Sequence, residues 1–268
     1  MKEISFDIIN KQEIELIVIS DTHIGSKQCN IELLKETVDY IKNNEDCYCI
    51  LNGDILDNLV ANSKVGDPYE NAMTPSVALN MACEIFDPIK EKILCSLGGN
   101  HDYDRSKKLT DITPAMALAV YLGLEKKFSA DSVILYLNFK YEYNRTTTFS
   151  IFVNHGRNGG GRNSGSKANA LESMSLIVPS CNIYIHSHTH YPMTFKDEFF
   201  QVDPRRRRGI WCERLYVNTN AFLNYFNGYG EAKLYRPSSQ SIPKIKLNVT
   251  RIQKHKTDRL IKSISCEI

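Results

Sequence analysis

Histidine, aspartate and asparagine recur in short polar stretches, and each stretch follows an apolar segment of the chain. The stretches are Asp21-Thr22-His23, Gly53-Asp54, Gly99-Asn100-His101-Asp102, His155-Gly156 and His188-Thr189-His190. Imidazole nitrogens, carboxylates and an amide oxygen together suit first-row metal ions such as Mn, Fe, Zn or Ni. These donors outnumber what one ion needs, so the pattern favours two ions that share a carboxylate.

Each of these stretches is common when it occurs alone. An aspartate after a strand usually forms a turn or caps a helix, Gly-Asp is a frequent turn dipeptide, and a lone histidine is usually a hydrogen-bonded structural residue. Here five such stretches each follow a predicted strand. Because the loops that leave the carboxyl ends of parallel strands meet in one crevice, we expect these side chains to form a single site.

The elements that would position the site are predicted by hydrophobic patterns. Apolar or alternating segments predict strands over 14–19, 48–51, 93–97, 133–139, 148–153, 182–185, 215–218 and 245–252. Helical spacing after a capping Asn30, after Pro75 and after Pro114 predicts three helices, and a fourth is expected over 168–177. Strands alternate with helices in the first half and predominate in the second, which suits two packed sheets with helices outside.

Length and composition indicate an ordinary globular protein. The chain has 268 residues, of which 24% are charged and 42% hydrophobic, and the net charge of +2 argues against a protein that coats polyanions. We expect a single domain over 1–268, with a surface excursion near 203–211. The N-terminus lacks the apolar core of a signal peptide and no apolar run would span a membrane, so a cytoplasmic protein without a membrane partner is expected.

The eight cysteines form no Cys-x-x-Cys pair, and several lie in apolar segments. We interpret them as reduced thiols of the core, as in a cytosolic protein. A zinc-thiolate site is the alternative, which this spacing disfavours.

The ordered polar stretches resemble the motifs of the calcineurin-like metallophosphoesterase superfamily. That pattern is Asp-x-His, Gly-Asp, Gly-Asn-His-(Asp/Glu), His and Gly-His-x-His, and it is matched here between residues 21 and 190. One departure is Ser187, which stands where the family has glycine. The resemblance implies an α/β fold, a four-layer α/β/β/α sandwich with two packed mixed β-sheets.

The resemblance also implies a role for each matching residue. Asp21, His23 and His190 would hold a first divalent metal ion, Asn100, His155 and His188 a second, and Asp54 would bridge both. Manganese is the expected metal, with Fe, Zn and Ni as alternatives. His101 would stabilise the transition state or protonate the leaving oxygen, and Asp102 would orient His101.

The superfamily includes protein phosphatases, nucleases, cyclic-nucleotide phosphodiesterases and nucleotide hydrolases, so the substrate must be inferred from local features. The glycine-rich segment 155–167 could cradle a phosphate with Arg157, Arg162 and Lys167, or it could be a solvated loop. Arg105 could reach a phosphate or pair with Asp104 or Asp102.

A further basic run, Arg205–Arg208 near Trp211, could bind nucleic acid, although a solvated loop is favoured. Together these features favour a phosphodiesterase that acts on nucleic acid or a nucleotide. The alternatives are a phosphomonoesterase acting on a phosphoprotein or a small phosphorylated metabolite, and a scaffold that has lost catalysis. The complete ligand set argues against the scaffold.

Overall fold

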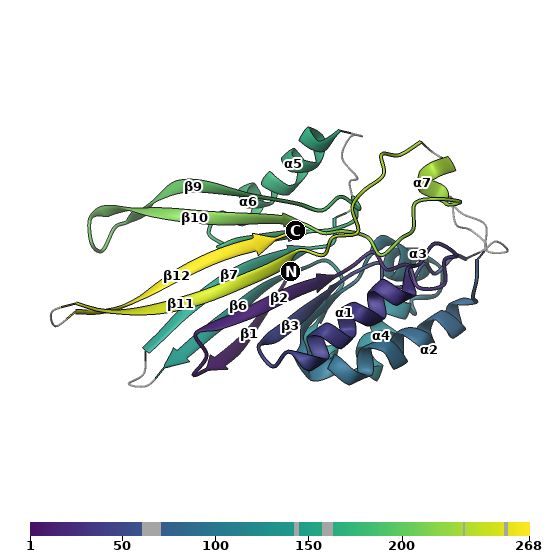
Figure 1. Ribbon diagram of the computed structural model, residues 1–268, viewed down its shortest axis with the longest axis horizontal. Coiled ribbons are helices and arrows are strands. Elements are labelled where there is room, and N and C mark those ends of the chain that lie inside the picture. The colour runs from purple at the N-terminus through teal and green to yellow at the C-terminus, as the bar shows by residue number, and fades with distance from the viewer. Residues whose placement is uncertain (61–70, 142–144, 157–162, 233, 255–256) are drawn as a thin grey trace.

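Two six-stranded mixed β-sheets pack face to face in the computed structural model, with helices on both outer faces (Figure 1). The structure describes residues 1–60, 71–141, 145–156, 163–232, 234–254 and 257–268. This architecture confirms the expected four-layer α/β/β/α sandwich.

The first sheet contains the strands that lead into most of the polar stretches. Its order is β12 (Thr257–Glu267), β11 (Lys244–Lys254), β2 (Glu13–Ile19), β3 (Cys47–Asn52), β4 (Ile93–Leu97) and β5 (Phe128–Ser129). Strands β2 to β5 are parallel, whereas β11 runs antiparallel to both β2 and β12. The parallel part therefore directs three strand ends, those of β2, β3 and β4, to one edge.

The second sheet has the order β1 (Lys2–Ile9), β6 (Ser132–Tyr141), β7 (Arg145–Asn154), β8 (Ile183–His186), β10 (Arg208–Asn218) and β9 (Met193–Asp203). Strands β7, β8 and β10 are parallel to one another, and antiparallel partners flank them on both sides. These three strands supply the remaining ends that face the site.

Helices α1 (Ile31–Asn43), α2 (Pro75–Phe86) and α4 (Pro114–Tyr121) cover the first sheet, and α5 (Ser164–Glu172) and α6 (Met174–Ile177) cover the second. The expected caps are present, since the Asn30 side chain accepts a hydrogen bond from the Leu33 amide at 3.1 Å and prolines occupy the first turns of α2 and α4. A short segment, η3 (Asn100–Asp104), joins β4 to α3 (Arg105–Thr110), and α7 (Tyr229–Ala232) lies near the C-terminal strands in sequence.

The core follows the twofold alternation of strand side chains. In β2, Leu16 and Val18 pack between the two sheets, whereas Ile17 and Ile19 pack under the helices of the first sheet. Because β2 is buried on both faces, its sequence is a nearly continuous apolar run. This explains why its position could be predicted from sequence.

Strands β1, β9 and β12 were not predicted, and β10 begins earlier than expected. Only Ile4 and Ile8 are buried in β1, and β9 alternates exposed with half-buried residues, so neither has a strong apolar pattern. The surface excursion expected near 203–211 is the exposed end of the β9–β10 hairpin, whose second strand already starts at Arg208.

The packing predicts a large difference between two leucine-to-alanine substitutions. Leu16 is fully buried between the sheets, whereas Leu176 on α6 is 82% exposed. We expect Leu16→Ala to lower the free energy of unfolding by about 3–5 kcal/mol, because it leaves a cavity in the core. Leu176→Ala should change it by less than about 0.5 kcal/mol. Urea unfolding followed by circular dichroism checks this, and equal losses would contradict the assignment of the core.

Candidate metal centre

The strands that precede the polar stretches end at the same side of the sandwich, β2, β3 and β4 in one sheet and β7 and β8 in the other (Figure 1). Backbone hydrogen bonds join the loops that follow them. The Asp21 amide donates to the Gly53 carbonyl at 3.1 Å, and the Ser187 amide donates to the His155 carbonyl at 3.0 Å. The site is therefore built on the fixed ends of both sheets.

Three overlapping groups of ligand atoms lie in this crevice, and within each group all atoms are within 4.8 Å of one another. The groups are Asp21, His23 and His190; Asp54, His155 and His188; and His23, Asp54 and His101. The structure thus brings together six of the seven side chains predicted to ligate metal. Asp54 belongs to two groups, as a shared carboxylate would.

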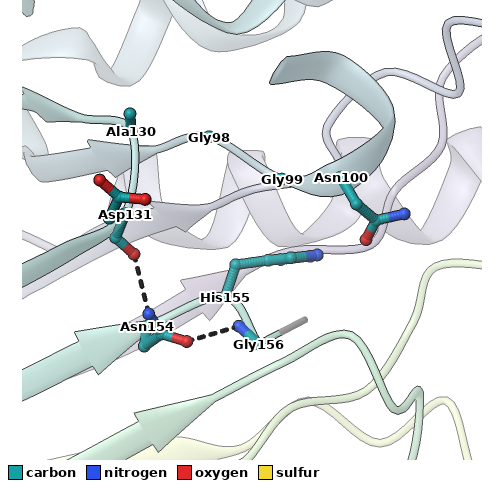
Figure 2. A pocket seen from close by; sticks show the side chains of 8 residues that line it. All are labelled: Gly98, Gly99, Asn100, Ala130, Asp131, Asn154, His155 and Gly156. Atoms are coloured by element: carbon teal, nitrogen blue, oxygen red, sulfur yellow. Dashed lines mark hydrogen bonds between the residues drawn. The ribbon is translucent and has the colours of Figure 1, made fainter. Parts of the chain in front are cut away.

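The seventh predicted ligand, Asn100, lies beside His155. Figure 2 shows the two side chains extending to the same side of a small pocket. Asn100 Oδ1 is buried and accepts no hydrogen bond from the described residues. Its position is compatible with the predicted role.

Three buried atoms of the centre lack a hydrogen-bond partner among the described residues: Asp21 Oδ1, Asn100 Oδ1 and His155 Nε2. His155 Nε2 does lie 3.3 Å from Asp54 Oδ2, and Asp21 Oδ1 lies 3.2 Å from His190 Nε2. Each imidazole is thus close to a carboxylate, but the geometry is not that of a hydrogen bond. An unpartnered buried polar atom costs about 1–3 kcal/mol. A divalent cation accepts electron pairs from such atoms, so this donor set fits one.

Five predicted ligands adopt a left-handed backbone conformation, with φ of 51° at Asp21, 47° at His23, 50° at Asp54, 66° at His188 and 53° at His190. Only a few per cent of non-glycine residues do so, although Asp and His are among the more tolerant types. Such conformations cluster at functional sites, where the surrounding structure enforces them. Ser187 has no such φ, which explains why serine can replace the family's glycine there.

Polar groups outside the predicted site residues hold the predicted ligands in place. His155 Nδ1 lies 2.6 Å from the Asn52 carbonyl, which leaves Nε2 to face Asp54. The Ser20 hydroxyl donates to Asp21 Oδ2 at 2.9 Å and lies 2.7 Å from the Thr219 hydroxyl. Thr219 in turn lies 2.9 Å from the Ser187 hydroxyl. Asn52 ends strand β3 and Ser20 directly follows β2, so the position at a strand end was the available clue in the sequence.

The prediction that Asp102 orients His101 is wrong. Both Asp102 carboxylate oxygens accept backbone hydrogen bonds instead, from the amides of Gly99 and Ile55 at 2.8 Å each. The carboxylate beside His101 is Asp57, whose Oδ1 lies 2.9 Å from His101 Nδ1 and 3.4 Å from His23 Nδ1. The η3 turn directs the Asp102 side chain back under its own loop. The clue to Asp57 was its position three residues after Asp54.

Charge balance keeps the carboxylates of the centre ionised. Burial raises the pKa of Asp54, but the charges of His155 and His101 outweigh this and hold the pKa well below its usual value. Burial, helped by the charge of His155, lowers the pKa of His188 to about 4 despite the nearby carboxylate of Asp21, which keeps its imidazole neutral and able to ligate a metal. Asp102 differs, because burial and the charge of Asp54 raise its pKa to about 6.

The cationic residues predicted to bind substrate lie at different distances from the metal centre, and two of them lie outside the described residues. Arg105 Nη1 donates to the Asp57 carbonyl at 2.8 Å, and Nη2 lies 3.1 Å from His101 Nε2, so Arg105 reaches the centre. Lys167 lies on α5 with its Nζ 4.6 Å from the centre of the Tyr191 ring, which directly follows His190 in sequence. Arg157 and Arg162 lie outside the described residues.

The run Arg205–Arg208 lies at the far end of the β9–β10 hairpin. Strand β9 has 11 residues and so extends about 35 Å from the crevice. The run therefore does not belong to the metal centre.

A family model for calcineurin-like phosphoesterases matches residues 14–192. The chain belongs to the calcineurin-like phosphoesterase family. The match spans every predicted metal ligand. No curated protein matches the chain.

Two solved structures resemble this calcineurin-like phosphoesterase. A metallophosphoesterase from Sphaerobacter thermophilus is 15% identical, with a TM-score of 0.40, and the alignment covers 88% of this chain and 83% of that one. Wild-type Vps29 complexed with Zn²⁺ from Entamoeba histolytica is 11% identical, with a TM-score of 0.36, and the alignment covers 94% of this chain and 99% of that one.

Close packing at Gly99 predicts that a single methyl group disrupts the centre of this phosphoesterase. A Cβ at Gly99 would overlap Asp54 Oδ1 and the Asp54 backbone nitrogen. We expect Gly99→Ala to weaken Mn²⁺ binding at least about tenfold, because it displaces the shared carboxylate. Gly209→Ala is the matched control, since its Cβ would be 3.6 Å from Phe200. Calorimetric titration with Mn²⁺ checks this, and equal affinities in both variants would contradict it.

Metal affinity should also depend on pH through His155. Burial lowers the pKa of His155, but the adjacent Asp54 charge outweighs this and raises it well above the usual value. A metal must displace that proton, so affinity should rise with pH, about tenfold per unit between pH 6 and 8 for one proton. Titrations in buffers of different ionisation enthalpy measure the released proton. His155→Gln should release less, and an unchanged proton count in that variant would exclude His155 as the source.

Proposed function

We propose that this chain is a dinuclear, metal-dependent phosphodiesterase that hydrolyses nucleic acid or a nucleotide. Membership in the calcineurin-like family implies metal-dependent hydrolysis of phosphoesters. The main support for a dinuclear centre is the position of Asp54, which is shared by two groups of donor atoms, one with His155 and His188 and the other with His23 and His101. Asp21, His23 and His190 would hold one ion, and Asn100, His155 and His188 the other, with manganese as the expected metal.

When bound by these residues, two divalent ions would supply a nucleophile near neutral pH and offset the negative charge of the phosphate. The protein residues supply position and proton transfer. Asp57 orients His101 through Nδ1, which leaves Nε2 directed toward the centre, 4.0 Å from Asp54 Oδ2. A protonated His101 can donate from Nε2 to the oxygen of the leaving group.

Arg105 links substrate binding to His101. In the structure its guanidinium lies 3.1 Å from His101 Nε2, the atom that must face the leaving group. A phosphate oxygen is a stronger acceptor for a guanidinium than a neutral imidazole is. Binding of the substrate phosphate would therefore draw Arg105 to the phosphate and free His101 Nε2 for catalysis.

Cations around the crevice support a diester of nucleic acid or a nucleotide as the substrate. Arg105 contacts the centre directly, and Lys167 lies beside Tyr191, next to the ligand His190. A chain of phosphates offers charge beyond the scissile group, which such cations can bind.

Cysteine usage supports a cytoplasmic location. All eight cysteines are free, and Cys47, Cys49, Cys83, Cys95 and Cys181 are buried. Free thiols persist in reducing compartments. No helix in the described part of the chain is long and apolar enough to cross a membrane.

The proposal predicts hydrolysis of bis-p-nitrophenyl phosphate in the presence of Mn²⁺, faster than hydrolysis of p-nitrophenyl phosphate. His101→Ala should lower kcat about 10²–10⁴-fold while metal content is retained, because proton transfer is lost. Asp57→Asn should lower kcat in the same direction, and Asp46→Asn, at a surface ion pair with Lys11, is the control. Elemental analysis and steady-state rates are the measurements. A preference for the monoester would favour a phosphomonoesterase instead.

A further inference from the structure

Two cations from different parts of the chain converge on the aromatic ring of Tyr191. Lys167 Nζ lies 4.6 Å and Arg236 Cζ lies 5.8 Å from the ring centre. Lys167 comes from α5 and Arg236 from the segment after α7, whereas Tyr191 follows β8. Both distances are within the range of cation–π contacts, so one ring gathers positive charge from two separate segments.

No carboxylate forms an ion pair with Lys167 or Arg236 within the part of the chain that the structure describes. Burial lowers the pKa of Lys167, and the charge of Arg236 lowers it further. Two like charges held close together repel each other, more strongly where water is partly excluded. An anion between them would turn this repulsion into attraction.

The backbone of Tyr191 is anchored next to the metal centre. Tyr191 directly follows His190, and its carbonyl accepts a hydrogen bond from Asn218 Nδ2 at 2.6 Å. Asn218 Oδ1 in turn lies 2.9 Å from Nδ1 of the buried His186, at the end of β8. Tyr191 is one residue along the chain from the proposed ligand His190, so the two cations on its ring lie in the neighbourhood of the crevice.

We propose that Lys167, Tyr191 and Arg236 form a binding site for a second phosphate of the substrate, next to the scissile diester. This inference rests on the proposed function and deepens it. The substrate is then an oligonucleotide, in which neighbouring phosphates are separated by one sugar. Lys167 and Arg236 bind the second phosphate by charge-assisted hydrogen bonds, and Tyr191 keeps the two cations in place.

The test compares dinucleotides that differ by one phosphate. The substrates are dithymidine monophosphate without a terminal phosphate and the same molecule with a 5′- or a 3′-phosphate, each with Mn²⁺-loaded protein. We expect kcat/KM to be at least about tenfold higher for one of the phosphorylated forms. In a Lys167→Met, Arg236→Met double variant this ratio should fall to near one.

Two controls separate the site from general charge effects. A Lys196→Met, Arg206→Met double variant removes two exposed cations of the β9–β10 hairpin and should keep the wild-type ratio. Tyr191→Phe retains the ring and should keep the ratio as well, whereas Tyr191→Ala should reduce it. A wild-type ratio near one, or a ratio unchanged in the Lys167 and Arg236 variant, would overturn the inference.

A binding measurement distinguishes failure of this inference from failure of the proposed function. Calorimetric titration of chelator-treated protein with the 5′- and with the 3′-phosphorylated dithymidine needs no catalysis. The Lys167 and Arg236 double variant should bind one of the two at least about tenfold more weakly than wild type. If no diester is hydrolysed but the double variant still binds more weakly than wild type, the proposed diesterase activity is refuted and the second-phosphate site is not. Equal affinities refute the second-phosphate site.

Discussion

The buried carboxylate of Asp54 is the constraint on which the rest of the centre depends. Asp54 is 1% exposed, so its charge must be compensated by neighbours and not by water. The His101 amide donates to Oδ1 at 2.7 Å, and His155 Nε2 lies 3.3 Å from Oδ2. Gly99 leaves room for the carboxylate, since a Cβ at that position would overlap it. Residues from β3, β4 and β7 must therefore meet around one side chain.

That meeting point joins the two sheets, and buried polar groups hold it together. Asn52 of the first sheet donates to the Ser187 hydroxyl of the second at 2.6 Å, and Thr219 connects Ser187 to Ser20. The apolar core between the sheets fixes the distance between them, but apolar contacts are not directional and cannot orient individual side chains. Hydrogen bonds at the strand ends orient the side chains there, because each polar group has a fixed number of donors and acceptors. The predicted ligands are thus oriented by residues outside the predicted ligand set.

Sequence reasoning anticipated that the predicted ligands would converge because each lies within a few residues of a strongly apolar strand, as His23 does after β2. It assigned the wrong carboxylate to His101, since Asp102 is adjacent in sequence whereas Asp57 becomes adjacent only through the η3 turn. It missed β9 because half-exposed strands have weak apolar patterns. The convergence of Lys167 and Arg236 on Tyr191 joins residues almost 70 positions apart, which no local pattern could reveal.

The strained and unpartnered groups are concentrated at the strand ends, not in the sheets. Left-handed conformations at Asp21, Asp54 and His188 raise the free energy of the folded loops, and so do the unpaired atoms of Asn100 and His155. The apolar cores on both sides of each sheet supply the stability that tolerates these costs. Because cations would relieve the unpaired atoms and the adjacent charges, metal binding and the ordering of these loops are thermodynamically linked. The sandwich can fold around its cores, while the final geometry of the loops depends on what they bind.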